Sequence, residues 1–158
     1  MFKSIDRKLS LRLLGSSLIA LACITLIARV WAVGNSSTKL PVTELKFGPT
    51  GVIDAHHLEL QAAPAYGDLA HGAHGTFIKM PAGFVSPIHT HTADYWGVVI
   101  SGVGANGVPG GTDVPLPVGS YWFQKGGERH VTKCLSANEC IFFINQASKF
   151  DYIPDAAK

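Results

Sequence analysis

Charge is scarce in this sequence and unevenly distributed. Acidic and basic side chains make up 15% of the 158 residues, and 13 basic and 11 acidic residues give a net charge of +2. Five of the basic residues and one acidic residue lie in positions 1–32, so 8 basic and 10 acidic residues remain, a net charge of −2. No basic patch remains there to attract a phosphate backbone, which excludes nucleic acid as an expected partner.

A long hydrophobic run is also missing. The longest apolar run, Leu13–Ala28, has sixteen positions, several of them small or polar, whereas a membrane-spanning helix needs about 20 apolar residues. The run follows a basic segment and precedes small residues, which is typical of a bacterial-type secretory signal peptide. We therefore predict a signal peptide over 1–32 and a periplasmic or secreted protein. Cleavage after Ala32, cleavage after Ala28 and retention as an anchor stay open.

A sustained helical period is absent from residue 33 onward. A polar linker at 33–43 leads into short apolar or alternating segments that Gly, Pro, Asn and Asp separate. This spacing is typical of a sandwich or barrel of antiparallel strands, so we predict a single all-β domain over 44–158. The eight expected strands are 44–48, 56–63, 75–80, 94–101, 119–124, 129–134, 139–146 and 149–153.

Several motifs of catalytic chemistry are missing as well. The sequence contains no Cys-x-x-Cys, no phosphate-binding loop and no Ser-His-Asp order. The stretch PIHTHTADYWGVVISG, residues 87–102, instead places His89 and His91 on alternate positions ahead of an aromatic and β-branched run. Alternate residues of a strand share a face and stand about 6–7 Å apart, so these two rings can converge on one metal ion.

The surroundings of the histidine pair resemble the first motif of the cupin superfamily, which is a Gly, five residues, His-x-His, three or four residues, a Glu, six residues and a Gly. Gly83, His89, His91 and Gly102 stand at the matching positions, and Tyr95 replaces the Glu. The stretch also looks like the small single-domain bacterial cupins that are classed as a domain of unknown function. The resemblance implies a double-stranded β-helix, the cupin jelly roll.

The second cupin motif is Pro-x-Gly, two residues, His, three residues and Asn. Gly127 and His130 match it, whereas Lys125 replaces the Pro and Cys134 replaces the Asn. The resemblance covers about residues 75–146. Because no second His-x-His occurs, we expect one cupin domain and not two.

The resemblance implies that His89, His91 and His130 hold one divalent transition metal. Imidazoles suit Zn, Cu, Fe and Ni, and three ligands on one side leave open coordination positions. Fe, Zn, Mn, Ni and Cu are not distinguished, and histidines packed without a metal are the alternative. We expect Tyr95 to donate a hydrogen bond beside the metal and to act on bound substrate or oxygen. Gln124 is a second catalytic candidate, as an amide ligand or a substrate donor.

Two cysteines, Cys134 and Cys140, follow the predicted signal peptide. The sequence between them suits the five-residue loop of a β-hairpin, and opposed strand residues have Cα atoms about 4.5–5.5 Å apart, which a disulfide tolerates. We therefore predict a disulfide that adds about 2 kcal/mol of stability and keeps His130 aimed at the site. Cys134 as a metal ligand is the rival interpretation, but four residues of strand put it about 13 Å from His130.

Three functions are consistent with these observations. The first is an exported, metal-binding cupin that oxidises a small organic molecule in a dioxygenase-like reaction. The second is a non-catalytic periplasmic cupin that binds or senses a small molecule or metal, and the third is a metal-free storage or interaction protein. The expected partner is a small molecule, with no stable membrane anchor once the signal is cleaved. A homodimer stays open.

Overall fold

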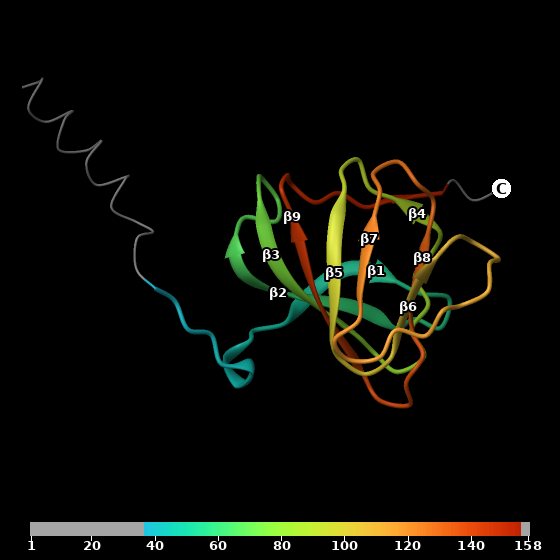
Figure 1. Ribbon diagram of the computed structural model, residues 1–158, viewed down its shortest axis with the longest axis horizontal. Helices are drawn as coiled ribbons and strands as arrows, with labels where there is room; N and C mark the ends of the chain where they lie inside the picture. Colours follow the sequence, from blue (N-terminus) through green and yellow to red (C-terminus); the bar gives the residue numbers. More distant parts are fainter. Residues whose placement is uncertain (1–36, 156–158) are drawn as a thin grey trace, which may run out of the picture. The chain divides into compact units, whose positions relative to one another are not determined.

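Antiparallel strands dominate the part of the chain that the computed structural model describes, residues 37–155 (Figure 1). The signal peptide that we predicted over 1–32 lies outside these residues. The described residues from Leu40 onward form one compact unit. Among the described residues, no helix has the length and apolar character needed to cross a membrane.

Ten strands follow a short 3-10 helix, η1 (Val42–Glu44), in the described residues. Their order along the chain can be followed by colour in Figure 1. The strands are β1 (Gly48–Ile53), β2 (Glu59–Gly67), β3 (His74–Met80), β4 (His89–Thr90), β5 (Tyr95–Ser101), β6 (Gly104–Gly107), β7 (Tyr121–Gln124), β8 (Val131–Cys134), β9 (Cys140–Gln146) and β10 (Ile153–Pro154).

The strands form a two-layered sandwich. Six strands make one antiparallel sheet in the order β1-β2-β3-β9-β5-β7, and the ladders β10-β4 and β6-β8 make the second layer. An isolated bridge between His89 and His130 joins these two ladders. Within residues 37–155 the six-stranded sheet keeps two edges, because no strand pairs with the outer side of β1 or β7. The barrel that we considered beside a sandwich is therefore not closed.

The core lies between the two layers and follows from alternation along β3, β5 and β9. Met80, Val99, Phe142 and Ile144 point inward and are each at most 4% exposed. Their neighbours in sequence point to the other face of the sheet, as the strand period requires. Burying each of these side chains contributes about 1.5–3 kcal/mol. Tyr95, at the start of β5, belongs to the same buried cluster, so the apolar core reaches the predicted site.

Close contacts explain two glycines. Gly102, a residue of the first cupin motif, has a φ of 78°, and a Cβ there would lie 2.8 Å from Cys140 Sγ. A Cβ at Gly97 would lie 2.2 Å from a ring carbon of Trp122. Gly97 therefore lets the Trp122 indole lie directly against β5, where it packs between the sheets.

The main errors of the expected strand set concern short or weakly patterned segments. We did not predict β4, which has two residues, or β6, whose sequence Gly-Ala-Asn-Gly has little intrinsic preference for a strand. All four residues of β6 nevertheless pair with β8. The expected strand at 44–48 is wrong, since it holds the last residue of η1 and only the first residue of β1.

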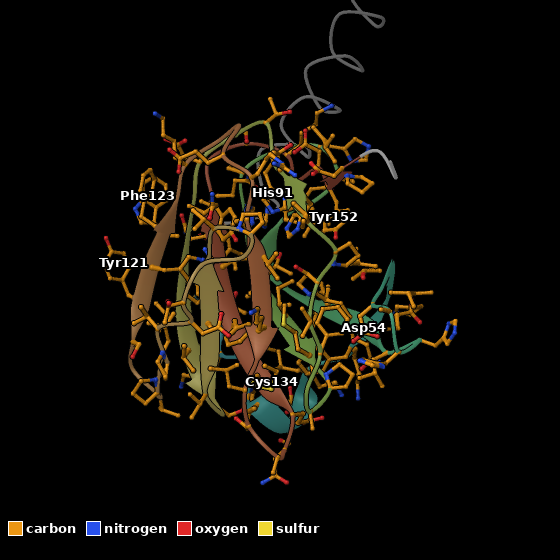
Figure 2. The ribbon with its side chains drawn as sticks, turned by 90° about the vertical axis from the view of Figure 1, so that its right-hand side faces the viewer. Asp54, His91, Tyr121, Phe123, Cys134 and Tyr152 are labelled. Carbon is orange, nitrogen blue, oxygen red and sulfur yellow. A yellow bond between two sulfur atoms is a disulfide. The ribbon has the colours of Figure 1, made fainter. Side chains whose placement is uncertain are left out.

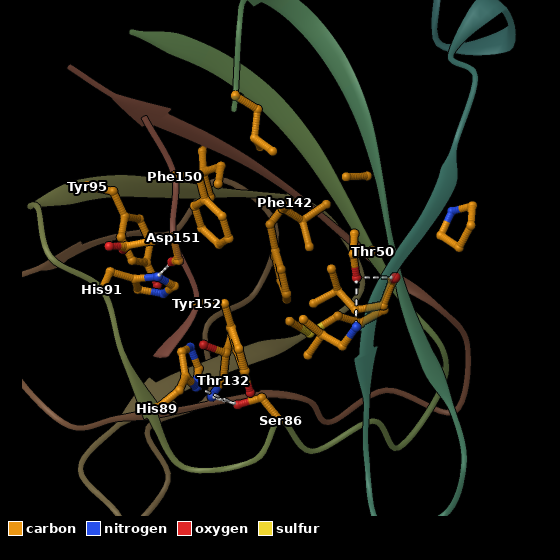
Figure 3. A pocket seen from close by; sticks show the side chains of 18 of the residues that line it. Thr50, Ser86, His89, His91, Tyr95, Thr132, Phe142, Phe150, Asp151 and Tyr152 are labelled. Atoms are coloured by element: carbon orange, nitrogen blue, oxygen red, sulfur yellow. Dashed lines mark hydrogen bonds between the residues drawn. The ribbon is translucent and has the colours of Figure 1, made fainter. Parts of the chain in front are cut away.

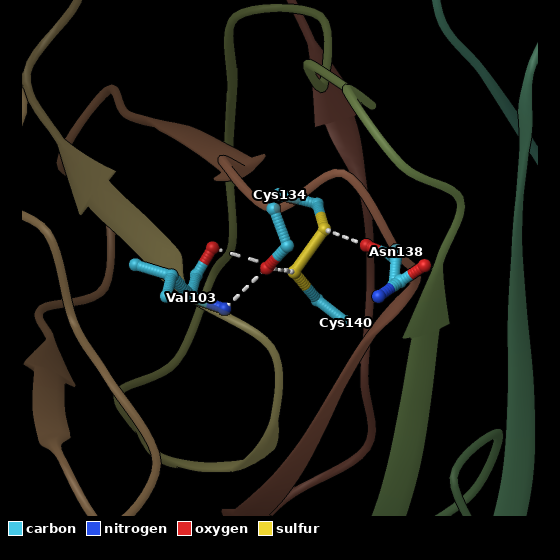
Figure 4. The surroundings of a disulfide bond; sticks show 5 residues. Val103, Cys134, Asn138 and Cys140 are labelled. Atoms are coloured by element: carbon cyan, nitrogen blue, oxygen red, sulfur yellow. Dashed lines mark hydrogen bonds between the residues drawn. A yellow bond between two sulfur atoms is a disulfide. The ribbon is translucent and has the colours of Figure 1, made fainter.

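The predicted disulfide between Cys134 and Cys140 is confirmed, with Cα atoms 5.6 Å apart, but the hairpin around it is not formed (Figure 4). β8 pairs with β6, whereas β9 pairs with β3 and β5, so the two cysteines belong to different layers. The segment between the two cysteines crosses from one layer to the other. Ser136, in this segment, accepts a hydrogen bond at its Oγ from the main-chain N–H of Val103 at 2.5 Å. The disulfide therefore links the two layers.

Candidate metal centre

Three histidines meet where the two ladders of the smaller layer join. His89 and His130 are directly opposite each other, because each main-chain N–H donates to the other residue's carbonyl at 3.2 and 3.0 Å. His91 follows two positions after His89 on the same face. One nitrogen of each ring lies within 4.8 Å of the others, and all three residues are buried. The structure thus brings together the three residues predicted as metal ligands.

Main-chain carbonyls determine which ring nitrogen is free. His89 Nδ1 donates to Pro87 O at 2.8 Å, and His130 Nδ1 donates to Glu128 O at 3.0 Å. His91 Nδ1 donates to Asp151 O. A carbonyl oxygen only accepts hydrogen bonds, so the proton of each neutral ring is on Nδ1 and the lone pair is on Nε2. Three Nε2 lone pairs fit a divalent transition metal such as Zn, Cu, Fe or Ni.

Burial keeps the three imidazoles neutral. Burial, with a smaller contribution from the neighbouring rings, lowers the pKa of His89 to about 3 and the pKa of His130 to about 4. The pKa of His91 is also lowered by burial, although its hydrogen bond to Asp151 O acts in the opposite direction. The neutral form is the one that binds metal, so protons do not compete for these nitrogens at neutral pH.

Tyr95 stands beside the histidines, on the face where we placed it. Its hydroxyl oxygen lies 3.4 Å from His130 Nε2, and the residue is 4% exposed. Burial raises the pKa of Tyr95 to about 12, so the phenol keeps its proton and can donate a hydrogen bond. The structure positions Tyr95 for the role that we predicted; the catalytic role itself stays a prediction.

Gln124 is buried on β7, and its side-chain amide is hydrogen-bonded to groups other than the three histidine rings. Its Oε1 accepts a hydrogen bond from Asn106 at 2.9 Å, and its Nε2 donates to Lys125 O and to Glu128 O at 3.2 and 3.4 Å. Glu128 O also accepts the hydrogen bond from His130 Nδ1. These contacts place Gln124 behind His130 as a residue that supports its orientation. A direct catalytic contact of Gln124 stays a prediction.

Residues 150–155, here called the C-terminal strap, complete the site, and we did not predict their part in it. The Asp151 carbonyl orients His91, and the Asp151 carboxylate accepts hydrogen bonds from the main chain of Thr92 at 2.8 Å and from its hydroxyl. Tyr152 stacks on His89 with ring centroids 4.2 Å apart. β10, within the strap, pairs with β4. The strap therefore contacts two of the three histidines.

A cavity of about 470 Å³ opens beside the histidines (Figure 3). His89 and His91 lie on one side of it, and Thr50 of β1 lies on the other, with Phe142 between them. This volume is within the range of small-molecule pockets in proteins. A metal held by the three Nε2 atoms would therefore be accessible to a small molecule.

The arrangement of the strands is that of a cupin jelly roll. Structures similar to this chain include the polyketide cyclase RemF from Streptomyces resistomycificus, with a TM-score of 0.62 and 16% identity over 78% of this chain and 88% of that one. An RmlC-like cupin from Ralstonia eutropha has a TM-score of 0.59 and 19% identity over 78% and 76% of the two chains. An acetylacetone dioxygenase from Acinetobacter johnsonii has a TM-score of 0.59 and 18% identity over 80% and 83%. At these identities the likeness shows the fold.

The chain belongs to the family described as Domain of unknown function (DUF4437), whose model matches residues 60–158. No curated protein matches the sequence. The matched range contains all three histidines, Tyr95 and the C-terminal strap. The predicted cupin jelly roll and the predicted resemblance to small cupins of a domain-of-unknown-function family are therefore both confirmed.

Proposed function

We propose that this protein is a metal-dependent enzyme that oxidises a small organic molecule with dioxygen. The observation that carries the proposal is the convergence of three neutral, pre-oriented Nε2 atoms beside a small-molecule cavity. Each ring is fixed by a hydrogen bond through its other nitrogen, which is how metal-ligating histidines are usually oriented. Enzymes among similar structures, such as the acetylacetone dioxygenase, add support for catalysis on this fold.

The histidines and Tyr95 would have different roles in this reaction. His89, His91 and His130 would hold the metal, beside the cavity that His89 and His91 line. A bound redox-active metal would supply Lewis acidity and electron transfer to dioxygen. Tyr95, protonated and 3.4 Å from His130 Nε2, donates a proton or a hydrogen bond to oxygen atoms that enter the site.

Metal analysis followed by an oxygen-uptake assay tests this proposal. The purified protein is stripped of metal, reloaded with Fe(II), Mn(II), Cu(II), Ni(II) or Zn(II), and incubated with panels of phenols and thiols. We expect oxygen uptake with a redox-active ion and none with zinc. Tyr95→Phe should keep the metal and lose most of the turnover, whereas His71→Ala, at an exposed residue outside the site, should change neither. Wild-type turnover by Tyr95→Phe would contradict the role of the phenol.

A non-catalytic cupin that binds or senses a small molecule or a metal is the second candidate. It is favoured by the missing carboxylate, since among the described residues the cluster of metal-binding groups contains three histidines and no Asp or Glu. Tyr95→Glu would add an anionic ligand near His130, so we expect it to bind metal more tightly. Ligand binding without turnover under every metal would favour this second function.

We also propose that the protein is exported to the periplasm or secreted. The basic segment followed by the sixteen-residue apolar run supports export, and a disulfide suits an oxidising compartment. Cell fractionation and mass spectrometry of the protein expressed with its own first 32 residues test this. We expect a mature chain that begins at residue 33 or 29. Full-length protein in the cytoplasmic fraction would contradict export.

A further inference from the structure

The cavity beside the histidines lacks positive charge. Among the side chains that line it, none belongs to Lys or Arg, and the single acidic residue is Asp151. The Asp151 carboxylate is turned to Thr92, from which it accepts two hydrogen bonds. An anionic ligand placed in this cavity would lose its hydration without gaining a protein cation, which is strongly unfavourable.

Most of the cavity wall is apolar. It includes side chains from β1, β2, β3 and β9 of the six-stranded sheet, namely Val52, Leu60, Ile78, Phe142 and Ile144. Apolar side chains of this kind bind uncharged hydrocarbon surface and gain about 25 cal/mol for each Å² that leaves water. The wall therefore selects for the apolar body of a ligand.

Polar groups of the cavity gather mainly at the histidine end. Four hydroxyl-bearing residues line the cavity beside His89 and His91, namely Ser86, Tyr95, Thr132 and Tyr152 (Figure 3). The hydroxyls of Thr132 and Tyr152 also donate to Asn106 Oδ1 and Pro87 O. Thr50 is at the opposite rim, where its hydroxyl donates to Leu60 O at 2.7 Å. The cavity thus has one polar end and one apolar end.

We propose that this cavity binds a neutral, largely apolar small molecule that presents a single oxygen-bearing group to the histidine end. Only the contact between that oxygen and a metal rests on the proposed function. In the metal-free protein, carboxylates, phosphates and sugar acids are not preferred ligands, because no Lys or Arg lines the cavity to meet them. Phenols, enols and ketones with a ring-sized apolar body fit both ends of the cavity.

Binding of three probes of the same shape to the metal-free protein tests the ligand class. Naphthalene, 2-naphthol and 2-naphthoate differ in the polar group and share the ring system, and their affinities are measured by calorimetry or probe fluorescence at pH 7.5. We expect naphthalene and 2-naphthol to bind, and 2-naphthoate to bind at least tenfold more weakly. Equal or tighter binding of 2-naphthoate, or binding of none of the three, would overturn the proposal.

A cation introduced at the cavity should reverse this preference. In Leu60→Arg, 2-naphthoate should bind at least tenfold more tightly than in the wild type and naphthalene more weakly. Thr50→Arg, at the rim, provides the same test if Leu60→Arg does not fold, as judged by circular dichroism. Leu135→Arg, at a half-exposed residue that does not line the cavity, is the matched control and should leave all three affinities unchanged. The same gain in the control would show that the probes bind elsewhere.

Zinc loading locates the oxygen of the ligand. Zinc held by the histidines should strengthen binding of 2-naphthol at least threefold relative to naphthalene, because only the naphthol carries an oxygen for the metal. Equal effects on both probes would contradict the predicted orientation. The experiments distinguish failure of the proposed oxidation from failure of the proposed ligand class. Probe binding with no oxygen uptake under any metal would reject the oxidation and keep the ligand class. Oxygen uptake without probe binding would reject the ligand class and keep the oxidation.

Discussion

The two ends of the sandwich are held together in different ways (Figure 2). At the histidine end, near His91 and Tyr152, the second layer consists of two-residue strands, a single bridge between His89 and His130, and the C-terminal strap. At the opposite end, near Cys134, a disulfide joins the two layers covalently. Short ladders, hydrogen bonds and ring stacking, all of them noncovalent, thus hold the end that carries the candidate chemistry.

The difference follows from what each end has to keep available. The histidine end buries three neutral imidazoles and leaves their Nε2 lone pairs without strong partners, which costs stability until a ligand binds. The disulfide end has no such groups and can be fixed permanently. If this comparison is correct, changes at the histidine end affect metal binding and pH response, and changes at the disulfide end affect stability alone.

Removal of the histidines should have the largest effect. We expect about one divalent metal per chain in the reloaded protein and almost none in the variant that combines His89→Ala, His91→Ala and His130→Ala. His130→Ala alone should weaken binding by more than about 100-fold, beyond the 10–100-fold that loss of an outer partner usually causes. Elemental analysis after dialysis measures both. His71→Ala is the control, and equal metal content in the wild type and the triple variant would show that the histidines pack without metal.

Acid should destabilise the metal-free protein through the same residues. The pKa values of His89 and His130, about 3 and 4 in the folded protein, lie below the ordinary value of 6.5, so below pH 6.5 the unfolded chain binds protons that the folded chain does not. Stability is therefore unaffected by them above pH 6.5 and falls as the pH drops toward 4, by up to about 1.4 kcal/mol per pH unit and histidine.

Urea unfolding of the metal-stripped protein between pH 7.5 and 4.5 measures this effect. The variant with Gln at all three histidine positions is the control, because an amide does not titrate, and the difference between the two proteins cancels the contribution of other groups. We expect the wild type to lose more stability than the variant on acidification. Parallel pH profiles would mean that burial does not hold these imidazoles neutral.

The sequence was informative where side chains carry the signal. The resemblance of Gly83, His89, His91 and His130 to the cupin motifs predicted the jelly roll and three side chains of the site, because glycine and histidine are required there for their own geometry and chemistry. The C-terminal strap carried no such signal, since Asp151 orients His91 through its carbonyl and every residue type has one. Main-chain contributions of this kind become visible only when distant segments are placed side by side.

Strand pairing was predictable only where it agreed with local pattern. The β6 sequence has little preference for a strand and becomes one through its partner β8. The hairpin that we expected between Cys134 and Cys140 was a reasonable inference because consecutive strands are usually neighbours. Here they lie in different layers. The disulfide was therefore predicted correctly for an incorrect structural reason, since two cysteines can approach across layers as well as across a ladder.

Loss of the disulfide should lower stability and leave the metal site intact. The double variant Cys134→Ser, Cys140→Ser should lose about 2 kcal/mol of unfolding free energy, since the bond closes only a short loop. Its metal affinity should change by less than about threefold, because contributions of separated sites are usually independent. Denaturant unfolding and metal titration on the same preparations measure both. A parallel loss of metal affinity would show that the bond supports His130, as we expected from the sequence.

The smallest expected effect concerns the strap and tests whether it supports the site from outside. Asp151→Ala removes the carboxylate that accepts two hydrogen bonds from Thr92 but keeps the carbonyl that orients His91. Because the carbonyl is then held less firmly, we expect metal affinity to fall about tenfold, the lower end of the range for loss of a supporting partner. Asp151→Asn keeps one acceptor for the Thr92 N–H. Its metal affinity should therefore lie between that of Asp151→Ala and that of the wild type.

The control for this series is Asp113→Ala, which removes an ion pair of 2.8 Å with Lys133 on the surface, away from the histidines. Both substitutions remove one carboxylate, so a difference between them reflects position and not charge. Metal titration should give wild-type affinity for the control and a graded loss across the Asp151 series. Equal affinity in all of these variants would mean that the pairing of β10 with β4 and the stacking of Tyr152 hold the strap without the carboxylate. The histidine end would then be as firmly held as the disulfide end. The two ends would differ in whether covalent or noncovalent bonds hold them, and not in how much they move.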